Sequence, residues 1–163
     1  MIILGLDPGS QKFGYALIQT QGNNFQQMNY IHSGIINLTK INGQWEKMKI
    51  VHKQALELLN KFNPEHVAIE GTIFHKNPQT LIKLAQIKIA FCGPLLGLES
   101  IQFYEYLPTV VKKANTGLGH ATKNLLAKRL KTQTLDKNHE FESFDESDAL
   151  AVAFCHFLHL GSL

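Results

Sequence analysis

The strongest constraint on the fold is an uninterrupted apolar run at the start of the chain, residues 2–6, which ends on Asp7. The run lacks the alternation of a strand with one wet face, so it predicts a central strand buried on both faces. A turn-forming segment, residues 8–10, follows directly. The strand is therefore expected to finish on a carboxylate.

The later segments predict a mixed order of strands and helices. Residues 14–20 and 25–38 predict two strands that form an antiparallel meander with the first, joined by a turn at 21–24. Apolar residues every three or four positions over 44–62 predict an amphipathic helix, and the strand 66–69 then ends on Glu70. The remaining expected elements are a helix from Asn77-Pro78 to about Cys92 that Gly93-Pro94 interrupts, a strand over 101–106, a short helix over 108–113, a helix from about 121, a polar loop over 131–142 and a final helix from 144 to about 158.

This order predicts an α/β class: a mixed five-stranded sheet, in which a three-strand antiparallel meander is followed by parallel strands, with helices on both faces. The 163 residues are enough for one core and too few for two ordinary domains, so we expect a single domain over residues 1–163. The sequence contains neither a membrane-spanning apolar run nor the pattern of a secretory signal, which predicts a cytoplasmic protein without membrane contact. Cys92 and Cys155 lie in apolar surroundings and are expected to be reduced core thiols.

Positive charge is concentrated in the middle of the chain. Residues 71–139 contain ten Lys and Arg against three acids, whereas the rest contains six against ten. This asymmetry suits a surface that collects phosphates beside an acidic pocket, although solvated helix faces explain the charge alone more simply.

Four carboxylates are expected to meet at one edge of the sheet. A strand–helix–strand connection makes the strand that ends at Glu70 parallel to the strand that ends at Asp7, so their ends lie side by side if the two are neighbours. Asp145 and Asp148 share one face at the start of the last helix, where Ser143 and Glu146 are spaced as a capping box. Asp148 precedes the apolar run 149–154, and an acid that enters a buried helix needs a partner.

Carboxylates that are brought together raise one another's pKa, and a divalent cation relieves the repulsion. Ligation by oxygen alone selects magnesium or manganese over zinc. Two such ions about 4 Å apart can activate water and stabilise the leaving oxygen of a phosphodiester. The pattern therefore indicates a nuclease.

The ordered motifs resemble the RuvC family of Holliday junction resolvases over nearly the whole chain. They are LGLDPGS at 4–10 with Gly14-Tyr15, AIE at 68–70, Lys76-Asn77, VKK at 111–113 with GLG at 117–119 and Lys123, and DESDALA at 145–151. The resemblance implies an RNase H-like fold and a homodimeric, Mg²⁺-dependent endonuclease that nicks a four-way DNA junction symmetrically in recombination and repair. It implies Asp7, Glu70, Asp145 and Asp148 as catalytic ligands, with two Mg²⁺ ions per site for which Mn²⁺ can substitute. It further places Lys112 and Lys123 near the scissile phosphates and the second helix at the dimer contact, and makes a branch-migration motor a plausible partner.

DNA contacts are expected from five lysines and one aromatic residue. Phosphate contacts dominate when a protein reads the shape of DNA, although each lysine alone is as easily a solvated charge. Phe13 stands where the family usually has a threonine. Ile73 occupies a position that is often aromatic in the family, so the next residue, Phe74, is the candidate for stacking on a base, with a core phenylalanine as the alternative. His156 and His159 are expected to be structural, because no third metal ligand is evident. The predicted DNA-contact residues are Lys76, Lys83, Lys112, Lys113, Lys123 and Phe74.

Three other functions fit parts of the pattern. Related nucleases that act on RNA/DNA hybrids or in ribosomal RNA maturation would keep the acids and change the substrate. A phosphotransferase of the actin and sugar-kinase type also begins with a strand and an Asp-x-Gly turn, but it usually needs two such domains. A DNA-binding module without catalysis is disfavoured because all four acids are present.

Overall fold

A computed structural model of the protein describes residues 1–20, 28–72, 77–133 and 139–161. Within these residues the strands are β1 Ile2–Asp7, β2 Lys12–Thr20, β3 Met28–Asn37, β4 His66–Glu70 and β5 Gln102–Tyr106. They form one sheet in the order β3-β2-β1-β4-β5. β1, β2 and β3 are antiparallel neighbours, whereas β4 runs parallel to β1 and β5 runs parallel to β4. The mixed sheet of an RNase H-like fold is thus confirmed.

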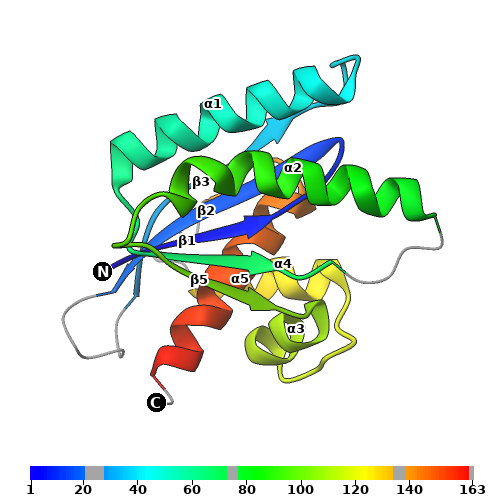
Figure 1. Ribbon diagram of the computed structural model, residues 1–163. Coiled ribbons are helices and arrows are strands. Elements are labelled where there is room, and N and C mark those ends of the chain that lie inside the picture. Colours follow the sequence, from blue (N-terminus) through cyan, green and yellow to red (C-terminus); the bar gives the residue numbers. More distant parts are fainter. Residues whose placement is uncertain (21–27, 73–76, 134–138, 162–163) are drawn as a thin grey trace.

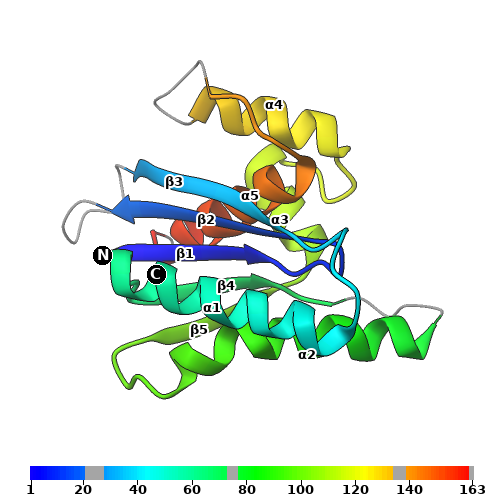
Figure 2. The ribbon, with the colours of Figure 1, turned by 90° about the horizontal axis from the view of Figure 1, so that it is seen from above.

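Helices cover both faces of the sheet, as predicted. Figures 1 and 2 show α1 (Gln44–Phe62) and α2 (Pro78–Leu96) side by side on one face. The opposite face is covered by α3 (Pro108–Thr116), α4 (Lys123–Gln133) and α5 (Phe144–Leu160). The sheet therefore lies between two helical layers, with α5 crossing beneath its centre.

The alternation of side chains along β1 contributes to two separate hydrophobic cores. Leu4 and Leu6 pack toward the side chains of α1 and α2, whereas Ile3 packs with α3, α4 and α5. All three residues are at most 1% exposed, so β1 is buried on both faces. This burial explains why its sequence is apolar without alternation.

Helix α2 does not stop at Gly93-Pro94, so that prediction is wrong. Proline removes one backbone donor from a helix, and this usually interrupts it. Here the helix continues to Leu96, because Phe91 and Leu95, on either side of Gly93-Pro94, are fully buried in the core. α3 and α4 likewise extend beyond the predicted bounds, so that part of the expected 131–142 loop is helical, and residues 134–138 lie outside the described chain.

Packing explains the phenylalanine at position 13, which differs from the residue usual in the family. Its ring is fully buried and stacks on Phe91 of α2, with the ring centroids 4.8 Å apart.

Cys92 and Cys155 are buried free thiols, as predicted, and burial raises their pKa values to about 11 and about 12. Among the described residues, no helix has the length and apolar character needed to cross a bilayer.

Candidate active site

The parallel pairing of β1 and β4 brings two of the predicted acids together. Leu6 is paired with Ile69, and each is followed by an acid at the carboxyl end of its strand. Asp7 and Glu70 therefore lie next to each other at one edge of the sheet, where ligand sites of α/β sheets gather. Their carboxyl groups are close enough to share a hydrogen bond.

Two glycines let α5 lie directly on the backbone of the sheet. A Cβ atom on Gly14 of β2 would stand 1.9 Å from the carbonyl oxygen of Asp145, and one on Gly5 of β1 would stand 2.3 Å from that of Ala149. No side chain fits at such distances, so glycine is required at both positions for this approach. The first two turns of α5 are thereby seated under β1 and β2, which carries Asp145 and Asp148 to the edge that holds Asp7.

The electrostatics of the site indicate that these acids face one another. Burial raises the pKa of Asp7 well above its ordinary value of 3.8, and the negative charge of Glu70 raises it further. Asp148 and Asp145 act on the Asp7 pKa in the same direction. The pKa of Glu70 is also raised, first by burial and then by Asp148, although the hydrogen bond with Asp7 partly lowers it.

Two of the predicted lysines lie at the acids. The Nζ atom of Lys123, the first residue of α4, donates to Oδ2 of Asp148 at 2.5 Å. Burial would lower the pKa of Lys123, but the bond to Asp148 and the charge of Asp7 raise it overall. The charge of Lys112 lowers the pKa values of Glu70 and Asp148, yet both remain raised because of burial. The site is thus short of positive charge.

These acids suit a divalent ion in their chemistry, because an all-carboxylate set is the donor set that Mg²⁺ and Mn²⁺ prefer. Their raised pKa values mark a cluster whose negative charge is not fully compensated. Across the described parts of the chain, no three His, Cys, Asp or Glu side chains already stand in metal-binding geometry. The Asp148 carboxylate is paired with Lys123. A metal ion held by Asp148 would have to displace this ammonium group.

The capping-box prediction is wrong, and the acid involved has another role. Ser143 precedes α5, but its side chain makes no cap hydrogen bond. Glu146 is only 2% exposed and accepts hydrogen bonds from Ser33 Oγ of β3 at 2.5 Å and from the backbone N–H of Glu142 at 2.6 Å. His139 Nε2 lies 3.2 Å from the same carboxylate. Glu146 therefore ties the start of α5 to β3, next to Asp145.

No local sequence signal indicates this contact, because Ser33 lies 113 positions from Glu146. An acid at the third position of a helix is ordinary. Its unusual burial follows only from the seating of α5 under β2 and β3.

The other predicted DNA contacts lie farther out. Lys83 is exposed on α2 and Lys113 is exposed on α3. In the described chain neither lysine forms an ion pair with any of the four acids. Lys76 and Phe74 lie outside the described residues.

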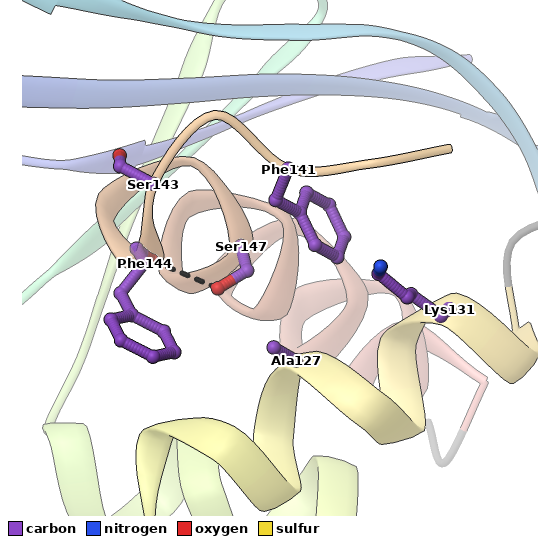
Figure 3. A pocket seen from close by; sticks show the side chains of 6 residues that line it. All are labelled: Ala127, Lys131, Phe141, Ser143, Phe144 and Ser147. Carbon is purple, nitrogen blue, oxygen red and sulfur yellow. Dashed lines mark hydrogen bonds between the residues drawn. The ribbon is translucent and has the colours of Figure 1, made fainter. Parts of the chain in front are cut away.

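Two hollows lie at the start of α5, and of the four acids only Asp145 lines either of them. One, of about 280 Å³, is lined by Asp145, Thr39 and residues 9–12 of the turn that follows Asp7. The other, also about 280 Å³, lies between α4 and α5. Figure 3 shows Phe141 and Lys131 on one side of it and Phe144 on the other, with Ser147 donating to the backbone of Phe144. It is lined by Ala127, Lys131, Phe141, Ser143, Phe144 and Ser147.

The two histidines near the end of α5 form hydrogen bonds away from the acids, and His156 is buried whereas His159 is exposed. His156 is 1% exposed, with Nε2 at 2.8 Å from His66 Nδ1 and Nδ1 at 2.7 Å from the Tyr106 hydroxyl. Burial lowers the pKa of His156 to about 4, helped by His66 and His159. His159 bonds through Nδ1 to the carbonyl of Cys155 at 2.8 Å.

Comparison with known proteins agrees with this arrangement. Residues 3–156 match the family model described as crossover junction endodeoxyribonuclease RuvC. The protein of that name from Helicobacter pylori (strain G27) is 42% identical over 158 residues, which cover 96% of each chain. The one from Halothermothrix orenii is 36% identical over 157 residues, which cover 96% of this chain and 92% of the relative.

Among solved structures, Thermus thermophilus RuvC in complex with a Holliday junction substrate superposes with a TM-score of 0.84 at 26% identity. The match covers 99% of this chain and 96% of that one. The resemblance of the motifs, the shared fold and these relatives agree. The chain therefore belongs to the RuvC family of crossover junction endodeoxyribonucleases.

Proposed function

We propose that Asp7, Glu70, Asp145 and Asp148 hold two Mg²⁺ ions with which this endonuclease cuts four-way DNA junctions. As a RuvC family member the chain is a nuclease that resolves Holliday junctions, and the family is metal-dependent. The proposal is supported by the arrangement of the acids: Asp7 and Glu70 end neighbouring parallel strands, and the charges of Asp148 and Asp145 on α5 act on Asp7 at the same edge of the sheet.

The residues of this edge have different roles. Bound divalent ions supply a nucleophilic water and charge for the leaving oxygen. Asp7, whose pKa is raised by burial and by the charges of Glu70, Asp148 and Asp145, would be central among the residues that hold these ions. Lys123 and Lys112 would offer ammonium groups to a phosphate when Asp148 helps to hold a metal ion, and Lys123 would then exchange one anionic partner for another. Both lysines lower the negative potential that otherwise repels DNA.

The proposed DNA contacts farther from the four acids stay predictions. Lys83 and Lys113 are exposed and suitably charged for phosphate. Lys76 and Phe74 are proposed on the resemblance alone. A branch-migration motor as partner, the cytoplasmic location and the single domain over 1–163 also stay predictions.

A homodimer is supported by the outer face of α2. Ile82, Ile89 and Leu96 follow one another at intervals of seven positions, which places them in one stripe along the helix. Their exposed fractions are 56%, 58% and 59%. Such an apolar stripe on a long helix suits pairing with a second copy, and a two-fold dimer suits paired cuts in a junction with two-fold symmetry.

The direct test is incubation with a synthetic mobile four-way junction and Mg²⁺. We expect paired symmetric nicks from the wild type, and binding without cutting from Asp7→Asn. A substrate panel with RNA/DNA hybrid and linear duplex separates the alternatives. Preferred cutting of the hybrid would point to an RNase H activity, and cutting that survives Asp7→Asn would remove the metal role of this residue.

A further inference from the structure

The single tryptophan of the chain, Trp45, lies exposed near the catalytic edge of the sheet. It occupies the first turn of α1 and is 73% exposed. Two residues farther on, Lys47 Nζ donates to the carbonyl of Ser10 at 2.8 Å, in the turn that directly follows Asp7. The start of α1 is therefore held beside a proposed metal ligand.

Trp45 lines a hollow between the start of α1 and the first three turns of α2. Gln44 Nε2 donates to the carbonyl of Lys83 at 2.9 Å and links the two helices there. α2 is the first helix after Glu70, so both walls of the hollow start at the edge that holds the acids. The hollow, named the Trp45 hollow below, has a volume of about 270 Å³ and is lined by Gln44, Trp45, Met48, Gln79, Ile82, Lys83 and Gln86.

The chemistry of this lining matches a nucleotide. The indole offers a flat face for stacking, which is sequence-tolerant because every base has a π-face. The glutamine amides can donate to and accept from base edges, and the Lys83 ammonium can meet a phosphate. The described lining contains no carboxylate that would repel DNA.

We propose that the Trp45 hollow binds an unstacked nucleobase of the junction strand that passes over the catalytic edge. The proposal rests on the proposed function, because junction DNA is the ligand. A second copy of the chain fits the hollow less well. The apolar stripe of α2 meets the hollow at Ile82, but four of the seven lining residues are polar or charged, namely Gln44, Gln79, Lys83 and Gln86.

Intrinsic fluorescence tests this directly, because all tryptophan emission comes from Trp45. The Asp7→Asn protein is titrated with an intact four-way junction, and binding is followed in parallel by the anisotropy of a dye on the DNA. We expect the emission to be quenched with the same midpoint as the anisotropy. Trp45→Ala in the same background should bind about tenfold more weakly, as for the loss of one stacked base, and Trp45→Phe should keep most of the affinity.

The matched control is His52→Ala, an exposed position on the same side of α1 two turns away and outside the hollow. It should bind the junction like the parent. Unchanged emission at saturating DNA, or equal affinity of Trp45→Ala, would overturn the inference. A second result would also overturn the inference. If the emission without DNA changes with protein concentration, and Trp45→Ala self-associates more weakly, the hollow is a contact between two copies of the chain. Absence of any anisotropy change would instead contradict the proposed function itself.

Discussion

The two ends of α5 both bury polar groups, but in opposite electrostatic states. Near its end, His156 is neutral and has a partner on each ring nitrogen. At its start, Asp148 and the neighbouring Asp7 face other carboxylates, and their pKa values are raised. A satisfied network stabilises a fold, whereas clustered like charges persist where something outside the chain completes them. The comparison separates a structural site from a functional one within a single helix.

The largest expected effect is on catalysis by the acids beside the start of α5. Asp7→Asn should reduce junction cleavage by about 10³-fold or more, because a metal ligand contributes several kcal/mol to the transition state. Single-turnover cleavage with the protein in excess over the junction measures this. Junction affinity, measured separately, should stay within a few-fold of the wild type. A loss of binding that accounts for the whole loss of cutting would contradict a catalytic role.

The same substitution should have the opposite effect on stability. The pKa of Asp7 in the folded protein is raised, so this carboxyl favours folding at low pH and opposes it as the pH rises through that pKa. Without metal at pH 7.5, Asp7→Asn should therefore raise the unfolding temperature, which a thermal melt followed by circular dichroism measures. Added Mg²⁺ should stabilise the wild type more than the variant. A lower unfolding temperature for the metal-free variant would show that the Asp7 carboxylate is not under repulsion.

The next largest effect is expected on stability, where the backbone of α5 packs directly against the sheet. Gly14→Ala places a Cβ atom against the Asp145 carbonyl and should cost about 1 to 3 kcal/mol of unfolding free energy, since the backbone has to move apart. Cleavage should fall as well, because Asp145 moves with the helix. Gly93→Ala is the matched control, since an added Cβ there meets open space. Equal stability of the two variants in urea unfolding would show that α5 does not press on β2.

The buried Glu146 beside the acids should matter less. Glu146→Ala leaves Ser33 Oγ and the Glu142 N–H without their acceptor, which should cost about 2 kcal/mol of unfolding free energy. Glu146→Gln keeps an acceptor and should cost less. Urea unfolding of both variants measures this, and equal losses would mean that the hydrogen bonds at Glu146 are unimportant.

The smallest effect is expected at the far end of α5. His156 has a folded pKa of about 4 against an ordinary value of 6.5, so the folded state binds fewer protons and loses stability as the pH falls through this window. The difference in unfolding free energy between the wild type and His156→Phe should shift against the wild type by about 1 to 2 kcal/mol between pH 7.5 and pH 5. Urea unfolding at the two pH values measures the shift. A difference independent of pH would mean that His156 is not held neutral.

The acidic end of α5 and the strands beside it could largely be predicted from local sequence. The apolar run before Asp7, the strand before Glu70 and the Asp145/Asp148 spacing each carry a short-range signal, and parallel pairing joins them. The partners of Glu146 and His156 could not be predicted, because they come from strands that are distant in sequence. The continuation of α2 past its internal proline could not be predicted for a related reason, since tertiary burial outweighs a local helix-breaking signal.

The most direct test of the metal centre is diffraction from crystals grown with Mn²⁺, whose anomalous signal locates the ions. Two peaks bounded by Asp7, Glu70, Asp145 and Asp148, with Lys123 turned away from Asp148, are the predicted result. Peaks elsewhere on the molecule, with Asp7 in contact with no ion, would contradict a four-carboxylate metal site.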